Sequence, residues 1–140
     1  MIILDTNVVS ELMSSSASVA VQSWVSEQHS IEEVFLTTIT VAEILYGIEL
    51  LPTGKRRDRL AFEAEAMFSE DFGGRVLAFD EEAARAFSKI AASRRTSGRP
   101  IAQFDAQIAG IALTRGATLA TRNTPDFEDC GVHLVNPWAE

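Results

Sequence analysis

The sequence has very little of the chemistry that stabilises small secreted proteins or binds transition metals. Of its 140 residues, one is cysteine and two are histidine. A single cysteine cannot form an intramolecular disulfide. No apolar run approaches the roughly 18–20 residues that a membrane-spanning helix needs, and the first residues lack the basic segment and cleavage site of a secretory signal. These absences predict a cytoplasmic protein with no membrane partner.

Positive charge is also scarce. Twelve lysines and arginines face twenty acidic residues, which gives a formal net charge of −8. Proteins that coat nucleic acids replace condensed counterions with an excess of basic side chains, so this balance argues against that class. The basic residues are clustered at 55–59 and at 94–99. Each cluster could contact phosphates or could be the solvated face of a helix, and the sequence does not choose.

The spacing of apolar residues alternates along the chain between the pattern of strands and the pattern of helices. Strands are predicted at 1–4, 34–37, 76–79, 117–121 and 132–135. Helices are predicted directly after residue 5, at 17–29, 40–50 and 55–72, from residue 80, and at 102–114. This alternation predicts an α/β layer fold with a mainly parallel sheet. Without an internal repeat or a linker, residues 1–140 are predicted to form one domain.

Four carboxylates fall at the boundaries of these predicted elements. Asp5 follows the first strand, and Asp126 follows the fourth together with Asn123. Glu43 begins the helix after the second strand, and Asp105 begins the helix before the fourth. Because ligands of open parallel sheets bind beyond the carboxyl ends of the strands, we expect these side chains to gather at one edge.

Carboxylates that converge repel one another, and they do not stay ionised and close without a cation. A site made of oxygen ligands, with no histidine or cysteine, selects a hard ion such as Mg²⁺ or Mn²⁺. Phosphodiester hydrolysis uses such an ion to activate water and to offset charge on the departing oxygen. The four acids therefore predict a metal-dependent hydrolytic site.

Each acid also has a purely structural explanation. Asp5 could cap the first helix. Thr40 and Glu43 have the spacing of a capping box, in which each satisfies a free backbone amide. Asp105 and Asp126 could lie in the first turns of their helices, where the helix dipole favours negative charge. No acid is decisive by itself.

Four ordered motifs carry a resemblance to a known family. They are Ile-Leu-Asp-Thr-Asn at 3–7, Ile-Thr-Val-Ala-Glu-Ile at 39–44, Phe-Asp-Ala-Gln-Ile-Ala at 104–109, and the segment 120–127. Together they resemble the PIN-domain ribonucleases. The stretch 51–57 and the closing residues 136–138 resemble the VapC/FitB-type toxins within that family, so the resemblance extends over nearly the whole chain.

The resemblance implies a three-layer α/β/α fold around a mainly parallel sheet of four to five strands. It also implies dependence on Mg²⁺, with Mn²⁺ as a substitute, and endonucleolytic cleavage of RNA by metal-activated water. In the family, the positions that match Asp5 and Asp105 are the usual direct metal ligands. The position that matches Glu43 is also needed for cleavage and is a further candidate ligand.

The fourth acid is where this sequence departs from part of the family. Some relatives have an aspartate where Asn123 stands here, whereas others keep asparagine and place an acid three positions later. Asp126 is therefore expected to supply the fourth charge and is a candidate ligand. The supporting residues that the resemblance implies are Thr6, Asn7, Thr121 and Asn123.

The resemblance also implies partners. The VapC/FitB-type toxins are homodimers that a cognate antitoxin holds inactive, and they reach DNA only through that antitoxin. RNA would be the substrate. The alternative is a degenerate PIN module that binds RNA or a protein without cleavage, which the loss of an acid would favour.

Overall fold

The computed structural model describes residues 1–31 and 33–139, and its centre is a five-stranded parallel sheet. The strands are β1 (Ile2–Leu4), β2 (Val34–Thr37), β3 (Val76–Leu77), β4 (Thr118–Ala120) and β5 (His133–Val135). Their spatial order is β3-β2-β1-β4-β5. All neighbouring pairs are parallel, and Ile3 aligns with Phe35 on one side and with Leu119 on the other. The expected parallel sheet is confirmed.

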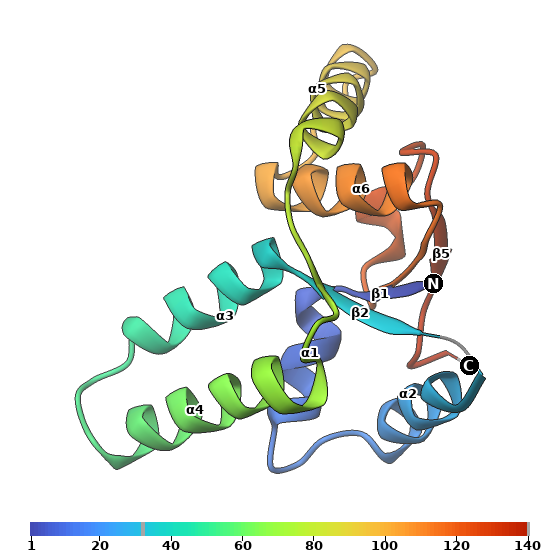
Figure 1. Cartoon of the computed structure of the whole chain (residues 1–140). Helices are drawn as coiled ribbons and strands as arrows, with labels where there is room; N and C mark the ends of the chain where they lie inside the picture. Colours follow the sequence, from blue (N-terminus) through green and yellow to red (C-terminus); the bar gives the residue numbers. More distant parts are fainter. Residues whose placement is uncertain (32, 140) are drawn as a thin grey trace.

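Helices connect the strands. They are α1 (Thr6–Met13), α2 (Val19–Ile31), α3 (Thr38–Glu49), α4 (Lys55–Ala66), α5 (Glu81–Thr96) and α6 (Gln103–Arg115), with the π-helical turn η1 (Met67–Asp71) and the 3-10 turn η2 (Thr124–Phe127). Figure 1 shows α5 and α6 on one side of β1 and β2, and α1 and α2 on the other. The arrangement is the expected three-layer α/β/α fold.

Alternation along the short strands divides the core into two halves. Ile2 and Leu4 pack with α1, α2, α3 and α4, whereas Ile3 between them packs with α5 and α6. Successive side chains of a strand point to opposite faces, so a strand buried on both faces reads as a continuous apolar run. The run at residues 2–4 is such a strand, and its three side chains are almost fully buried.

The order of the strands creates a switch point between β1 and β4. The chain proceeds from β1 to β2 and β3 on one side, and it then crosses to β4 and β5 on the other. The backbone amide of Asp5 donates to the carbonyl of Ala120 over 2.8 Å, which holds the two strand ends together. A crevice at the carboxyl ends of strands next to such a reversal is the usual ligand site of this fold class.

Two predicted helix starts differ from the structure by two residues. Helix α2 was expected from residue 17 and begins at Val19, and the other is the start of α3. We expected a helix at 40–50, but α3 begins at Thr38 and its N-cap is Thr37, whose hydroxyl accepts from the Thr40 amide at 3.1 Å. The capping box between Thr40 and Glu43 is therefore not formed. The predicted helix at 55–72 is present in two parts, since α4 ends at Ala66 and η1 continues it to Asp71.

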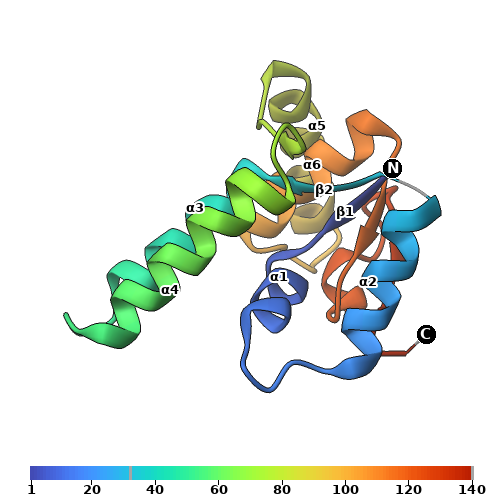
Figure 2. The same cartoon turned by 60° about the horizontal axis from the view of Figure 1, so that its bottom comes forward.

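Two pairs of helices extend from the sheet. Helices α3 and α4 lie side by side and form an arm that projects away from the strands (Figures 1 and 2). Helices α5 and α6 cross closely at Gly110, where an added Cβ would lie 2.7 Å from the carbonyl oxygen of Ala83. No helix in the described part of the chain is long and apolar enough to cross a membrane.

Candidate active site

Asp5 is a buried carboxylate at the end of β1, and it is also the N-cap of α1. Its Oδ1 accepts a hydrogen bond from the backbone amide of Thr6 over 2.8 Å. Its Oδ2 accepts from the hydroxyl of Thr121 over 2.8 Å and from the side-chain amide of Asn7 over 3.1 Å. Three donors from two chain segments therefore fix the orientation of this carboxylate, and the two interpretations of Asp5, cap and site residue, are compatible.

Opposing influences act on the pKa of Asp5. Burial raises the pKa, and the negative charge of Glu43 adds to that rise. The hydrogen bonds from Thr121, Thr6 and Asn7 lower it by stabilising the ionised form. The net result is a pKa above the ordinary value, because desolvation is the largest contribution. Asp5 is thus an oriented carboxylate whose ionised form is disfavoured by burial.

Glu43 is held by a chain of threonine hydroxyls. Thr6 Oγ1 donates to Glu43 Oε1 over 2.7 Å, and it lies 2.9 Å from Thr40 Oγ1. A hydroxyl has one proton to donate, so Thr40 is the donor in the contact with Thr6. Thr37 in turn donates to Thr40 over 3.4 Å. This relay explains why Glu43 does not close a capping box, and it joins α3 to the start of α1.

Asp105 lies in the first turn of α6, and its carboxyl group is partly buried. Its pKa is raised to about 6, first by burial and then by the negative charges of Asp5, Glu43 and Asp126. No donor in the described part of the chain hydrogen-bonds its carboxylate. The three acids that act on Asp105 show that all four predicted carboxylates share one electrostatic environment.

Asn123 and Asp126 follow β4, as predicted. The backbone amide of Asn123 donates to Thr121 Oγ1 over 3.1 Å, so the same hydroxyl contacts both Asp5 and this loop. Asn7 also reaches the loop, where its Oδ1 accepts from the Arg122 amide over 3.2 Å. Asp126 lies in the first turn of η2, and the structural interpretation of its position is therefore compatible with a place in the site.

These side chains surround one cavity of about 270 Å³ at the switch point. The residues that line it are Asp5, Thr6, Asn7, Ser10, Glu43, Asp105, Asn123, Asp126 and Phe127. The structure thus brings all four predicted acids and three of the four supporting residues to one cavity, and the fourth, Thr121, contacts Asp5. Sequence reasoning missed Ser10 and Phe127. Ser10 stands four residues after Thr6, a spacing that places both on one helix face.

The donor chemistry of this cavity fits a hard divalent cation. Its candidate ligands are carboxylate and amide oxygens, which Mg²⁺ and Mn²⁺ prefer. In the described part of the chain, no three acidic, histidine or cysteine side chains yet stand together as an assembled metal site. A bound cation would offset both the burial and the mutual repulsion that raise the pKa of Asp105.

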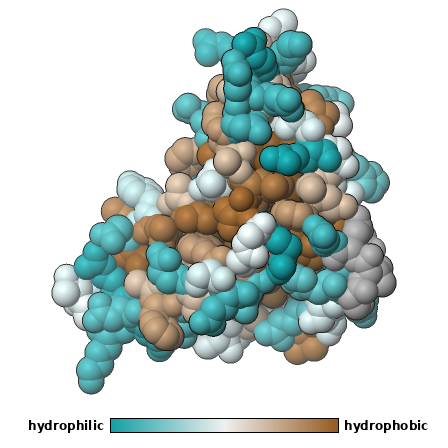
Figure 3. Space-filling view, in the orientation of Figure 1, coloured by the Kyte–Doolittle hydropathy of each residue, from teal (hydrophilic) through white to brown (hydrophobic). Residues whose placement is uncertain are grey.

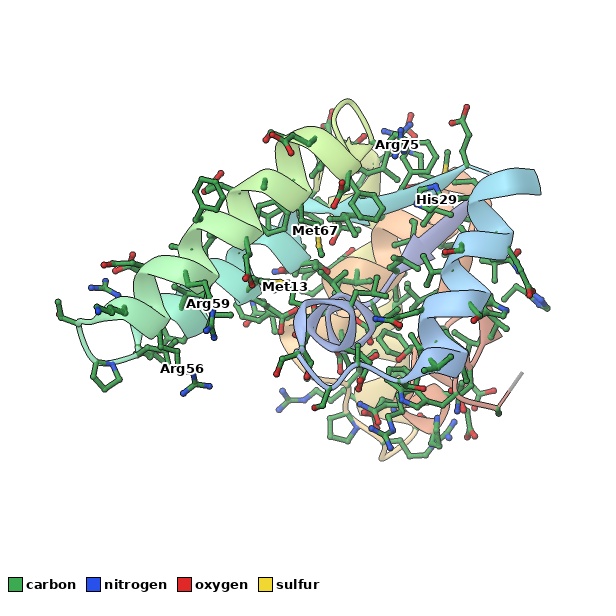
Figure 4. All side chains as sticks on the ribbon, turned by 90° about the horizontal axis from the view of Figure 1, so that it is seen from below. Met13, His29, Arg56, Arg59, Met67 and Arg75 are labelled. Carbon is green, nitrogen blue, oxygen red and sulfur yellow. The ribbon has the colours of Figure 1, made fainter. Side chains whose placement is uncertain are left out.

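A larger groove of about 650 Å³ continues from the acidic cavity between α1, α3 and α4, and the two share Thr6, Ser10 and Glu43. Arg56 and Arg59 line its far end, and Figure 4 shows both extending from α4 near the tip of the arm. The other arginine of this helix turn, Arg57, instead pairs with Glu49 at 2.6 Å. The basic cluster at 55–59 is therefore divided between the groove and the outer surface.

The second basic cluster, at 94–99, is not uniform. Arg95 is exposed, as a solvated helix face requires. Arg99 pairs with Glu128 at 3.3 Å and with Asp129. Arg94 is buried, so neither of the interpretations that the sequence offered for it, phosphate contact or solvated face, is correct. A single charged residue among exposed ones gives no sequence signal of burial.

Fold and site together define a three-layer α/β/α protein with an acidic site at the switch point of a parallel sheet. The family model of the PIN domain matches residues 2–131. The chain therefore belongs to the PIN-domain family.

Three relatives are similar over nearly the whole chain. Plasmid stability protein StbB of Pseudomonas syringae pv. tomato is 43% identical over 99% of both chains. VapC ribonuclease Y4jK of Sinorhizobium fredii is 41% identical over 99% of this chain and 98% of that protein. Toxin FitB of Neisseria gonorrhoeae is 38% identical over 99% of both chains. The crystal structure of FitAcB from the same organism superposes with a TM-score of 0.89 at 37% identity, covering 100% of each chain.

Proposed function

We propose that this protein is a Mg²⁺-dependent endoribonuclease, and that it is the toxin of a toxin–antitoxin pair. The observation that carries the proposal is the cavity at the switch point, which four acids line and where three donors fix the buried Asp5. Membership of the PIN-domain family and similarity to a protein named as a VapC ribonuclease support it.

Asp5 and Asp105 are the proposed metal ligands, with Glu43 and Asp126 as further ligands or catalytic acids. They come from four different elements and differ in how firmly they are held. Asp5 has three hydrogen-bond donors and Glu43 has one, whereas neither Asp105 nor Asp126 has a side-chain donor in the described part of the chain. Asp5 would therefore fix the position of the ion, and Asp105 would adjust to it.

Mg²⁺ bound among these oxygens would supply the Lewis acidity that activates water and offsets negative charge on the phosphate oxygens. The protein contributes the orientation of the acids. Thr121 and Asn7 keep the Asp5 carboxylate aimed at the cavity. The threonine relay keeps the Glu43 carboxylate at the boundary between this cavity and the larger groove. An RNA strand that reaches the acids would lie along that boundary.

Asp5→Asn tests the proposal. The purified variant is expected to fold but to lose cleavage of a mixed RNA substrate in Mg²⁺, because Asn cannot supply the charge that holds the ion. Glu65→Gln, at an exposed site on α4, is the matched control and should cleave like the parent. Circular dichroism and thermal unfolding report on the fold. Cleavage by Asp5→Asn at the parental rate, or by the parent in excess EDTA, would show that the assignment is wrong.

Direct Mn²⁺ binding separates the nuclease from the degenerate module. Titration of the metal-free parent, followed by electron paramagnetic resonance, is expected to show saturable binding in the micromolar to millimolar range. Asp5→Asn should abolish it. A parent that binds RNA but no Mn²⁺ would instead be the non-cleaving module.

The proposed partner is a cognate antitoxin, supported by similarity to FitB, which is named as a toxin. Expression of the chain alone should arrest bacterial growth, Asp5→Asn should relieve the arrest, and co-expression of the antitoxin encoded beside it should do the same. We expect DNA contact only through that antitoxin. Growth arrest by Asp5→Asn as strong as that by the parent would contradict a nuclease toxin.

We also infer a homodimer in the cytoplasm. Three large apolar side chains on the arm, Tyr46, Leu50 and Phe62, are each more than 60% exposed. Figure 3 shows a hydrophobic band that extends from the arm toward the centre of the same face. An exposed apolar area of this kind is typical of a protein–protein interface. Light scattering of the purified chain should give the mass of a dimer, and Phe62→Glu should give that of a monomer.

A further inference from the structure

Arg94, in the last turn of α5, is the one buried basic side chain in the described part of the protein, with 6% of its surface exposed. Its guanidinium contacts carbonyl oxygens from two other segments. Nε donates to the Arg99 carbonyl over 2.7 Å. Nη1 donates to the carbonyls of Asp126 and Glu128 over 2.9 and 3.0 Å, and it lies 3.7 Å from Cys130 Sγ. No carboxylate in that part of the chain pairs with it.

The two segments that Arg94 joins lead to two acids of the site. The Arg99 carbonyl belongs to the loop that enters α6, which carries Asp105 in its first turn. The Asp126 carbonyl belongs to the short turn η2, and the side chain of the same residue lines the cavity. The backbone of Arg94 contributes as well, since its carbonyl accepts from the Arg99 amide over 2.9 Å. One residue thus fixes the backbone of Asp126 and the loop that leads into the helix of Asp105.

This arrangement is costly for a residue that only closes a loop. A buried cation loses its hydration, and neutral carbonyls repay that loss only in part. The same loop is already linked to the η2 segment on the surface by Arg99, which pairs with Glu128 and Asp129. Meanwhile Asp105 and Asp126 both line the cavity, and neither carboxylate has a hydrogen-bond donor in the described part of the chain. The backbone beneath Asp126 therefore needs a rigid support that its own side chain does not supply.

We propose that Arg94 is a positioning residue of the acidic site, which holds η2 and the loop before α6 so that Asp126 and Asp105 face the cation. The inference rests on the proposed function, because it assigns Arg94 a role toward the same metal. Groups beyond the ligands that orient them commonly alter metal affinity by ~10–100-fold when they are removed. The guanidinium is suited to this role because its Nε and Nη1 donate to two different segments at once, whereas a lysine ammonium is a single point charge.

The first test compares Arg94→Met, Arg94→Lys and Arg95→Met in the full-length protein. Arg95 is the matched control, since it follows Arg94 on the same helix turn and is exposed. Mn²⁺ affinity of each metal-free variant is measured by electron paramagnetic resonance, with thermal unfolding as the measure of folding. We expect Arg94→Met to bind Mn²⁺ about 10-fold more weakly, Arg94→Lys to show a smaller loss, and Arg95→Met to match the parent. If Arg94→Met does not fold, Arg94→Lys is compared with the parent in its place. A folded Arg94 variant that binds Mn²⁺ as tightly as the parent would overturn the proposal.

A double-mutant cycle with Asp126→Asn distinguishes positioning from general damage. Arg94 contacts the backbone of Asp126 itself but only the loop before Asp105, so its effect should pass mainly through Asp126. Arg94→Met should therefore cost much less Mn²⁺ affinity in the Asp126→Asn background than in the parent. An equal loss in both backgrounds would show that Arg94 acts on the protein as a whole, and it would overturn the proposal. Failure of the proposed function has a different signature, because the parent itself would then bind no Mn²⁺.

Discussion

Replacing Asp105 by asparagine is expected to make the metal-free protein more stable at neutral pH. Burial of the Asp105 carboxyl, and after it the negative charges of Asp5, Glu43 and Asp126, raise its pKa from 3.8 to about 6. A group with a raised pKa binds more protons in the folded than in the unfolded state. Folding stability therefore declines as the pH rises from about 4 to about 6, and it levels off above that range. Asparagine preserves the shape of the side chain and removes the charge that causes the decline.

The magnitude follows from the pKa. A change from 3.8 to about 6 corresponds to roughly 3 kcal/mol between the two protonation states. Asp105 is only partly buried, so solvent reduces this value, and we expect Asp105→Asn to gain about 1–2 kcal/mol at pH 7.5. The gain should vanish below pH 4, where the parent carboxyl is protonated in both states. Comparing the two proteins isolates Asp105, because the raised pKa of Asp5 is present in both.

Urea unfolding between pH 3 and pH 8 in EDTA measures this difference. Asp58→Asn is the matched control, since Asp58 is also an acid in the first turn of a helix, but it is exposed and lies in α4. It should lose a few tenths of a kcal/mol through the helix dipole and gain nothing. Added Mg²⁺ should reverse the order of parent and Asp105→Asn, because a ligand at 100 times its Kd stabilises the protein that binds it by about 2.7 kcal/mol. An Asp105→Asn variant no more stable than the parent at pH 7.5 would refute the electrostatic reasoning.

Three further outcomes follow from individual contacts. Thr121→Val removes the 2.8 Å hydrogen bond to the Asp5 carboxylate and should cost about 1.5–3 kcal/mol at pH 7.5 in urea unfolding, with Thr121→Ser as the variant that restores stability. Asp126→Asn should lower the pKa of Asp105, and Glu43→Gln should lower it more. Carbon-13 NMR of the Asp105 carboxyl measures both changes, and an unchanged titration in both variants would show that the acids do not interact. Gly110→Ala places a Cβ 2.7 Å from the Ala83 carbonyl and should cost about 1–3 kcal/mol, whereas Gly47→Ala, with open space around it, should gain about 0.5–1 kcal/mol.

The layers of the fold could be predicted from the sequence because periodicity is a local signal. The buried run at 2–4 and the apolar stripes of the helices are present in consecutive residues, and the core confirms both. The order of the strands in the sheet could not be predicted from this local periodicity. The position of β1 between β2 and β4 depends on which strands pair across the whole chain. The sequence could therefore place Asp5 at a strand end, but not at a switch point.

The acids of the site could be predicted for a similar reason, since each stands at an element boundary. The hydrogen bonds that hold these acids in place could not be predicted. The relay from Thr37 through Thr40 and Thr6 to Glu43 joins residues up to 37 positions apart. The sequence instead favoured a local partner for Thr40, the capping box, which the earlier start of α3 excludes. Long-range hydrogen bonds leave no local pattern, and a local pattern that fits can mislead.

The four acids divide into an anchored pair and an unanchored pair, and this division is the physical basis of the proposed site. Asp5 and Glu43 are oriented by donors from α1, α3 and the end of β4. Asp105 and Asp126 have no side-chain donor in the described part of the protein, and only the backbone beneath them is fixed, in part by Arg94. If all four carboxylates were anchored, the site could not relax its repulsion in the absence of a cation. If none were, an ion would have to order the whole cavity on binding. A fixed pair that faces an adjustable pair lets the metal-free protein fold despite the charge of Asp105, and it leaves the geometry of binding to be set by Asp5.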